Sequence, residues 1–258
     1  EMCIRDRVIY NVVDRMYIGH MPGDAAGVAL TGVGVTFPLI TLVAAFTNLF
    51  ATGGAPLCAI ARGQGDNKKA KNIEAQTFTM QILVGLAIMC LLYIVKKPAL
   101  YLLGASDITY GYANSYISIY LIGTVFMMVG TGMNGFINLQ GFPKIGMFST
   151  MLGAAVNIVL DPVFIFVLGF GVWGAAVATV ISQFCSACFV TCFLFGRKVI
   201  IHITVADMLK LDFKLLKEIV TLGMSGFIMA ATNCAVQAVC NATLSVHGGD
   251  IYICLLYT

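Results

Sequence analysis

Asn157 and Asp161 lie four residues apart in a long apolar run, within the segment Asn157-Ile-Val-Leu-Asp161-Pro162. Residues at this spacing share one face of a helix. Pro162 has no backbone N–H, so the carbonyl oxygen of Ile158 loses its helical donor. An amide oxygen, a carboxylate and a freed carbonyl are the oxygen ligands that hard cations such as Na⁺ prefer. A carboxylate at the centre of a membrane helix costs about 2.5–3.5 kcal/mol, so Asp161 indicates an ion or proton site.

Asp14 is a second acid in an apolar context, and Tyr10 precedes it by one helical turn. Adjacent helical residues point about 100° apart, so Arg15 is expected to face elsewhere. We therefore expect Asp14 to belong to the same kind of site. Pairing of Asp14 with Arg15 or another cation, or a position at the membrane edge, stays open as the alternative.

Smaller polar side chains occur in two further apolar runs. Thr179 and Gln183 are one turn apart in one of them, and Asn134 and Asn138 are one turn apart in the other. They are candidates for a polar pocket. The structural alternative is that each forms a hydrogen bond to a neighbouring helix, which contributes about 0.6 kcal/mol.

Composition identifies the kind of protein that holds these residues. The chain has 258 residues, of which 59% are hydrophobic and 10% charged, whereas soluble domains carry about 25% charged residues. Its uncharged stretches reach the ~20 residues that a membrane helix needs. We predict an all-α, polytopic membrane helix bundle with about six and a half transmembrane helices. The expected spans are a truncated one at 8–19 and complete ones at 29–60, 73–95, 112–138, 145–168, 173–196 and 216–246.

Loop charge predicts the orientation. Lysine and arginine concentrate in the loops after the second, fourth and sixth spans, and such loops face the cytoplasm. We therefore expect a multi-pass protein of the cell (inner) membrane with loops 62–71, 143–146 and 197–217 in the cytoplasm. The polar segment 202–217 has the apolar spacing of a surface helix.

Several function classes are disfavoured. The basic residues sit in short loops without a basic, aromatic groove, so we expect no nucleic-acid partner. Cys185-x-x-Cys188 lies in an apolar run without a nearby histidine, which argues against a metal or redox site. No catalytic triad, phosphate loop or histidine cluster occurs in the sequence, so we do not expect an enzyme.

Four segments together resemble the bacterial branch of the multidrug and toxic compound extrusion (MATE) transporters, over about residues 8–250. They are Val13-Asp14-x-x-Tyr17-Ile18-Gly19, Gly63-Gln64-Gly65-Asp66, Asn157-Ile-Val-Leu-Asp161-Pro162-x-Phe164-Ile-Phe166 and Gly171-Val-Trp-Gly174-Ala-Ala-x-Ala-Thr179.

The resemblance implies a monomer of twelve helices in two six-helix bundles, of which this chain holds the first bundle and the seventh helix. The first bundle would span 8–200, a cytoplasmic connector 201–217 and the start of the second bundle 218–250, with the rest of that bundle missing. Residues 1–7 are polar where a membrane span should be apolar. We expect 1–7 and 251–258 to be non-native.

The resemblance also implies export of small organic, often cationic, compounds in exchange for H⁺ or Na⁺, with no other cofactor. The residues at the family's cation site are Asp14, Asn157, Asp161 and Thr179, which would ligate the metal if Na⁺ is the coupling ion. Tyr10 and Asn134 match neighbouring pocket positions. The alternatives are a lipid-linked precursor flippase of the same superfamily, a membrane-embedded enzyme, and a structural or channel-like membrane protein.

Overall fold

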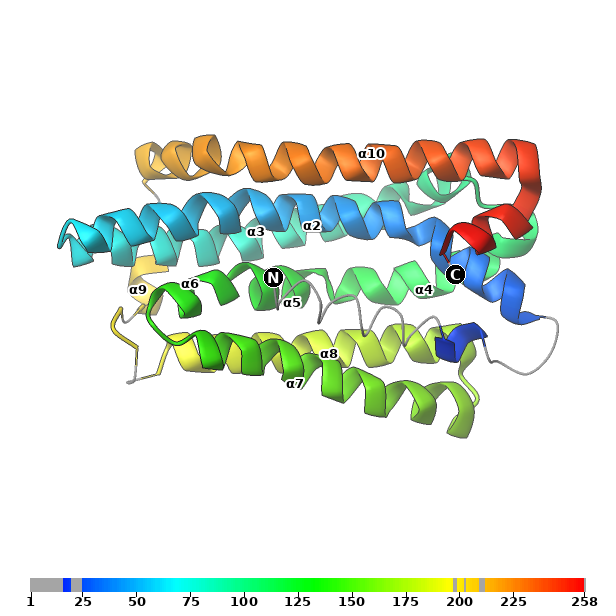
Figure 1. Ribbon diagram of the computed structural model, residues 1–258, viewed down its shortest axis with the longest axis horizontal. Helices are drawn as coiled ribbons and strands as arrows, with labels where there is room; N and C mark the ends of the chain where they lie inside the picture. Colours follow the sequence, from blue (N-terminus) through cyan, green and yellow to red (C-terminus); the bar gives the residue numbers. More distant parts are fainter. Residues whose placement is uncertain (1–15, 20–24, 197–198, 202, 209–211, 258) are drawn as a thin grey trace.

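The chain forms a bundle of long helices that run along one common direction (Figure 1). The computed structural model describes residues 16–19, 25–196, 199–201, 203–208 and 212–257. Within these ranges there are helices and connecting turns and no strands. The helices are α2 (Ala25–Gly63), α3 (Asn67–Leu102), α4 (Asp107–Ile122), α5 (Thr124–Gly132), α6 (Asn134–Leu139), α7 (Pro143–Pro162), the π-helix η1 (Val163–Val167), α8 (Gly171–Leu194), α9 (Val205–Met208) and α10 (Phe213–Tyr257).

The predicted membrane spans are largely confirmed. Five helices among the described residues are long and apolar enough to cross a membrane. A sixth crossing would be the helix pair Asp107–Ile122 and Thr124–Leu139, which is bent by 55°. The expected continuous span at 112–138 is therefore wrong in this respect. The bend lies at Gly123, where an added Cβ would be 2.7 Å from Oε1 of Gln183, so a close helix contact accompanies the break.

The first predicted span is tested over only part of its length, and the boundaries predicted after residue 200 differ from the structure. Of the first span, 8–19, only residues 16–19 are described, and they are helical. The expected surface helix at 202–217 is reduced to the short α9, and α10 already begins at Phe213. The last five residues of the expected connector are thus part of α10, and 251–257, expected to be a non-native tail, continue the same helix.

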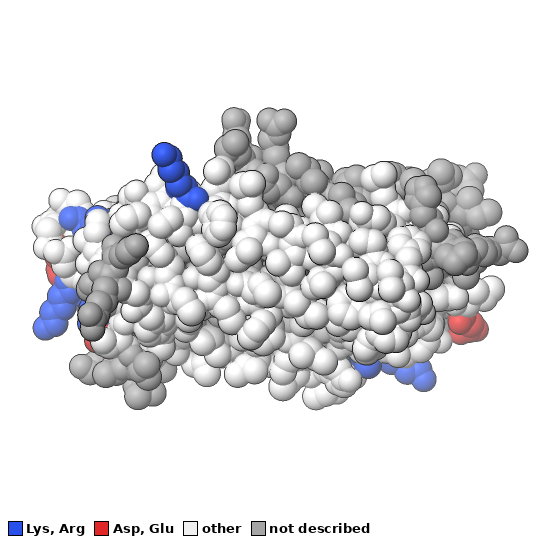
Figure 2. All heavy atoms as spheres, turned by 90° about the horizontal axis from the view of Figure 1, so that it is seen from below, with Lys and Arg blue, Asp and Glu red and all other residues white. Residues whose placement is uncertain are grey.

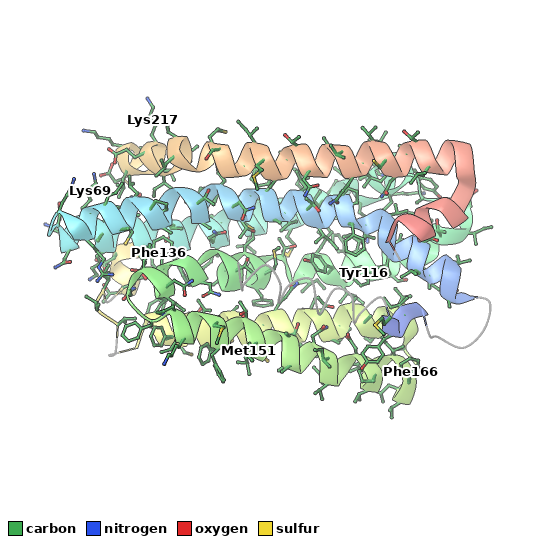
Figure 3. All side chains as sticks on the ribbon, viewed as in Figure 1. Lys69, Tyr116, Phe136, Met151, Phe166 and Lys217 are labelled. Carbon is green, nitrogen blue, oxygen red and sulfur yellow. The ribbon has the colours of Figure 1, made fainter. Side chains whose placement is uncertain are left out.

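The two ends of the bundle differ in charge. The end of α2, the start of α3, the α6–α7 turn, the end of α8 and the start of α10 lie together, and we call this the basic end (Figure 1). It carries the lysines of 68–71, 144 and 214–217. Figure 2 shows charged side chains toward the two ends of the visible face, with an uncharged band between them. Figure 3 shows side chains on both sides of α2 along its length. The concentration of charged residues toward the ends of the bundle, with an uncharged band between them, is typical of a membrane-spanning protein.

Helix α10 lies along α2 in Figure 1, and glycines allow the contact. A Cβ added at Gly53 would be 2.0 Å from the carbonyl oxygen of Ile219, and one at Gly223 would be 1.7 Å from that of Leu49. The two backbones therefore meet without side chains between them. Membrane helices commonly associate in this way because small residues permit close packing.

Candidate functional site

Helix α7 presents the residues that the sequence singled out. It starts after the turn at Gly141, which has a positive φ of 92°, and Pro143 occupies its first turn. Asn157 and Asp161 are both buried, with exposed fractions of 1% and 0%. Nδ2 of Asn157 donates to Oδ1 of Asp161 over 3.2 Å. The predicted common face of these two residues is confirmed.

The helix changes type directly after Asp161. Pro162 ends α7, and the π-helix η1 follows. The backbone N–H of Val163 bonds to the carbonyl of Leu160, and that of Leu168 bonds to Val163 over 2.9 Å. A proline removes one helical hydrogen bond, and π-turns inside helices occur often at functional sites. The irregular backbone that the proline predicted lies next to the buried carboxylate.

The buried amide of Asn157 keeps an oxygen available. Its Oδ1 is buried and accepts no hydrogen bond from the described part of the chain. A buried polar atom of this kind needs a partner, such as water or an ion. Because the nitrogen of the same amide is held by Asp161, Oδ1 remains the atom that can bind a cation.

Thr179 lies on the neighbouring helix α8 and is 4% exposed. Its hydroxyl donates to the carbonyl oxygen of Ala175 over 2.9 Å, which leaves the lone pairs of Oγ1 for an incoming ligand. Gly174 allows α8 to approach η1, because a Cβ there would be 2.8 Å from the carbonyl oxygen of Phe164. Asn157, Asp161 and Thr179 thus stand on two helices that pack together.

Asn134 occupies a different level of the bundle. It is buried at the start of α6, and Nδ2 donates to the carbonyl oxygen of Gly146 over 3.1 Å. At about 1.5 Å per residue, Gly146 and Asn157 are roughly 16 Å apart along α7. The structure therefore does not bring Asn134 into contact with the carboxylate pair, and its place in the pocket stays a prediction.

Asp14 and Tyr10 lie outside the described residues. The nearest described part of their predicted span reaches η1, since the rings of Tyr17 and Phe166 meet edge to face with centroids 6.1 Å apart. Ile18 beside it is 1% exposed. The end of that span is therefore packed beside the helix that follows Asp161.

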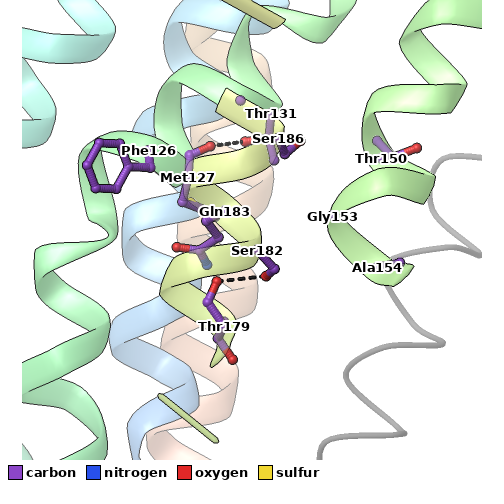
Figure 4. Close-up of a pocket in the computed structure, with 11 residues that line it drawn as sticks. Phe126, Met127, Thr131, Thr150, Gly153, Ala154, Thr179, Ser182, Gln183 and Ser186 are labelled. Atoms are coloured by element: carbon purple, nitrogen blue, oxygen red, sulfur yellow. Dashed lines mark hydrogen bonds between the residues drawn. The ribbon is translucent and has the colours of Figure 1, made fainter. Parts of the chain in front are cut away.

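A cavity of about 50 Å³ lies between α5, α7 and α8 (Figure 4). A volume of this size accommodates a few water molecules. Figure 4 shows Thr150, Gly153 and Ala154 on one side and Thr179, Ser182 and Gln183 on the other. The residues that line the cavity are Phe126, Met127, Gly130, Thr131, Thr150, Gly153, Ala154, Thr179, Ser182, Gln183 and Ser186.

The hydroxyl groups of this cavity share one property. Each donates its proton to a backbone carbonyl, as Thr131 does to Met127 (2.7 Å) and Thr150 to Met147 (2.8 Å). Ser182 donates to Thr179 (2.7 Å) and Ser186 to Ser149 (3.0 Å). Their oxygens are left as acceptors. Oε1 of Gln183 also lacks a partner among the described residues, but it lies toward Gly123 at the bend between α4 and α5, so the hydroxyl oxygens supply the acceptors of the cavity. The cavity therefore suits ligands that donate hydrogen bonds or carry positive charge.

The sequence indicated only part of this cavity. Thr179 and Gln183 stood out as polar residues of one apolar run, whereas Thr131, Thr150 and Ser186 did not. A lone serine or threonine hydroxyl in a membrane helix usually donates to a carbonyl of its own helix, so its presence in the sequence does not indicate a pocket. Their convergence depends on how α5, α7 and α8 pack.

Asn157, Asp161 and Thr179 carry oxygen atoms of the kinds that a hard monovalent cation or a proton would use. A carboxylate, an amide oxygen and a hydroxyl oxygen are buried on adjoining helices. The described residues contain no cluster of three or more histidine, cysteine, aspartate or glutamate side chains that could hold a metal. Among the described residues, a cation at this site would be bound by the neutral oxygens of Asn157 and Thr179 and by one carboxylate, that of Asp161.

Comparisons with known proteins agree with this architecture. The chain is 25% identical over 241 residues to the multidrug export protein MepA of Staphylococcus haemolyticus, covering 93% of this chain and 52% of that protein. It is 24% identical to MepA of Staphylococcus saprophyticus over the same shares. The chain therefore spans about half the length of the curated relatives that it matches.

Solved structures show the same fold. The MATE multidrug transporter DinF-BH, in a structure with a bound ligand, superposes with a TM-score of 0.92 at 25% identity, covering 99% of this chain and 56% of that one. An inward-facing MATE family transporter of the MOP superfamily gives 0.89 at 25% identity, covering 96% and 56%. The family model MatE matches residues 7–163. The chain is a multi-pass membrane protein and belongs to the MatE family of transporters.

Proposed function

We propose that this chain is the first half of a cation-coupled antiporter that exports small, organic, often cationic compounds. The observation that carries the proposal is the buried Asn157–Asp161 pair, on a helix that also lines an acceptor-rich cavity. An intramembrane carboxylate indicates a functional site by default. The basic end would face the cytoplasm, as the positive-inside rule predicts.

The coupling ion would bind at Asp161, Asn157 and Thr179, with Asp14 as the expected second acid. Asp161 supplies the charge, Oδ1 of Asn157 a buried neutral ligand, and Oγ1 of Thr179 a further oxygen. H⁺ and Na⁺ both suit this set, because a carboxylate can be protonated or can ligate a metal. No other cofactor is needed.

The substrate would bind in a space of which the described cavity forms one part. Thr179 belongs both to the proposed ion site and to the cavity lining. Phe126 and Met127 supply apolar contact, and the hydroxyl oxygens accept hydrogen bonds. Pockets of this kind, mostly apolar with a few placed polar groups, favour small organic ligands. Ion and substrate would therefore compete for neighbouring positions.

Competition between the ion and the substrate would couple the inward movement of one to the outward movement of the other. The ion would stabilise the state that releases substrate outward, and the substrate would stabilise the state that lacks the ion. Two ligands that favour different states couple through their differential affinities. The curated relatives are multidrug export proteins, and DinF-BH is a multidrug transporter, which is consistent with this class of substrate. A second bundle, absent from this half-length chain, would complete a monomeric transporter.

Transport assays on the full-length parent in proteoliposomes test the proposal. Wild type and Asp161→Asn would be compared for export of a fluorescent organic cation, driven separately by a Na⁺ or a proton gradient. We expect at least a tenfold loss in Asp161→Asn under the gradient that drives the wild type. Glu218→Gln, which removes only a surface ion pair with Lys69, is the matched control. Wild-type export by Asp161→Asn overturns the proposal.

The competing transporter, a lipid-linked precursor flippase, would need a cationic cavity for its anionic substrate. The side chains that line the described cavity carry no positive charge. A membrane-embedded enzyme would need clustered catalytic side chains. The acceptor character of the cavity favours the exporter of cationic compounds over both.

A further inference from the structure

Glu74 is a buried carboxylate far from the proposed ion site. It lies in the first part of α3, at the basic end, and is 0% exposed. Its Oε1 and Oε2 both accept from Nε2 of Gln140, over 3.0 and 3.1 Å. A buried charge is costly unless it is hydrogen-bonded, so this contact needs an explanation beyond the ion site.

Gln140 connects Glu74 to the chain that follows α8. It stands at the end of α6 and is 2% exposed. Its Oε1 accepts from the backbone N–H groups of Ile200 and Ile201, over 3.1 and 3.2 Å. The orientation of the amide is thereby fixed, with the nitrogen toward the carboxylate and the oxygen toward the two N–H groups.

The segment held by Gln140 lies against the bundle. Val199, Ile201 and Ile203 are buried, whereas Ile200 between them is 57% exposed. Alternation with a period of two is typical of an extended chain with one face covered. Two residue pairs continue the attachment to α3: Lys71 with Asp207 (2.7 Å) and Thr79 with the carbonyl of Met208 (3.2 Å).

Arg62 contacts the same group of residues around Glu74 and Gln140. Its guanidinium donates to the carbonyl oxygen of Leu139, the residue before Gln140, and interacts electrostatically with Glu74. A positive group near the carboxylate offsets part of the cost of burying it. Helices α2, α3 and α6 therefore all contribute to the point at which the chain after α8 is held.

We propose that Glu74 is a positioning residue that acts through Gln140 to fasten the described chain after α8, residues 199–201 and 203–208 (here called the connector), to the first bundle. The Glu74 carboxylate holds the Gln140 amide in the one orientation in which its oxygen receives Ile200 and Ile201. The connector is then held to α3, and the start of α10 is held to the same helix, because Nε2 of Gln76 donates to the carbonyl oxygen of Asp212 over 3.3 Å. The structural part of this inference is independent of cation coupling, and only its consequence for transport rests on the proposed function.

An exchange of the two side chains tests the inference. Gln140→Glu removes the amide donor and places two buried carboxyl groups face to face, which disfavours the orientation that presents a side-chain oxygen of residue 140 to the connector. The double variant Glu74→Gln/Gln140→Glu restores one amide and one carboxylate. The carboxylate then lies at position 140, where it accepts from both connector N–H groups, and the amide at position 74 donates to it.

The measurement is hydrogen exchange of peptides covering 199–208, in the full-length parent in lipid nanodiscs without substrate or ion gradient. We expect exchange to rise at least about tenfold in Gln140→Glu, as the loss of one to two buried hydrogen bonds implies. The double variant should return to within about threefold of wild type. Gln64→Glu, at an exposed turn position, is the control and should leave the exchange unchanged.

Two results overturn the inference: wild-type exchange in Gln140→Glu, or exchange in the double variant as fast as in Gln140→Glu alone. If Gln140→Glu does not fold, recovery of folded protein in the double variant supports the inference, and failure to recover it counts against the inference. Wild-type transport by Asp161→Asn would overturn the proposed function but would not change the hydrogen-exchange results expected here. The two proposals can therefore be rejected independently.

Discussion

The side-chain amide of Asn157 points its nitrogen at Asp161, 3.2 Å away and one turn along α7, and its oxygen into a buried position without a partner in the described chain. The carboxylate thus fixes which atom of the amide can bind a cation. In the proposed ion site, Asn157 would both hydrogen-bond the carboxylate and supply a ligand.

Replacing Asn157 by alanine should weaken cation binding without removing the charge. One charge-assisted hydrogen bond and one neutral ligand are lost together, and hydrogen bonds to charged groups contribute about 1.5–3 kcal/mol. We expect affinity for the coupling ion to fall roughly tenfold or more, measured by equilibrium binding in detergent. Asn138→Ala, at an exposed position on α6, is the control. Unchanged affinity in Asn157→Ala would remove Asn157 from the site.

Thr179 offers a sharper comparison because one variant replaces only its hydroxyl and a second removes only its methyl group. Thr179→Val keeps the volume and removes Oγ1, whereas Thr179→Ser keeps the oxygen and its bond to the Ala175 carbonyl. We expect Thr179→Val to lose ion-driven transport at least tenfold and Thr179→Ser to retain most of it. Equal effects of the two variants would show that the hydroxyl is not a ligand.

Sequence periodicity predicted the local part of this site, because Asn157 and Asp161 lie on one helix and their common face follows from their spacing. Thr179 is buried on the adjoining helix, and its place at the ion site stays a prediction. The change to a π-helix after Pro162 was predicted only as a broken hydrogen bond. A proline removes a donor, but the packing of α8 against η1 decides which carbonyl the following N–H groups reach.

The long-range contacts could not be predicted from spacing. Glu74 lies at the start of the expected span 73–95, and nothing in the local sequence indicates what its side chain contacts. Its contact is with Gln140, 66 residues further along the chain, which in turn binds the connector that follows α8. The bend at Gly123 likewise depends on Gln183 of another helix.

The contact between α2 and α10 should tolerate no side chain at Gly223. A Cβ there would be 1.7 Å from the carbonyl oxygen of Leu49, and backbone atoms cannot rotate away. We expect Gly223→Ala to lower the free energy of unfolding by about 1–3 kcal/mol or more, the usual range for overpacking. Thermal unfolding in detergent measures the effect.

Gly27→Ala is the matched control for this prediction, because an added Cβ at Gly27 meets nothing within 4 Å. Alanine favours a helix over glycine by about 1 kcal/mol, so this variant should unfold at the same or a higher temperature. A Gly223→Ala variant as stable as Gly27→Ala would contradict the close contact of the two helices.

The part of the connector's attachment that depends on Asp207 should be lost only in strong acid. The Lys71 side chain, together with the hydroxyl of Thr204, lowers the pKa of Asp207 to about 2 from an ordinary value of 3.8. Since the pKa is lowered by folding, this contribution is complete above about pH 4 and disappears as the pH falls toward 2. Hydrogen exchange of 199–208, corrected for intrinsic rates, should therefore be constant from pH 7 to 5 and rise between pH 4 and 2. Asp207→Asn should show the faster exchange at every pH without that acid step, whereas an acid step of the same size in Asp207→Asn would assign the change to another group.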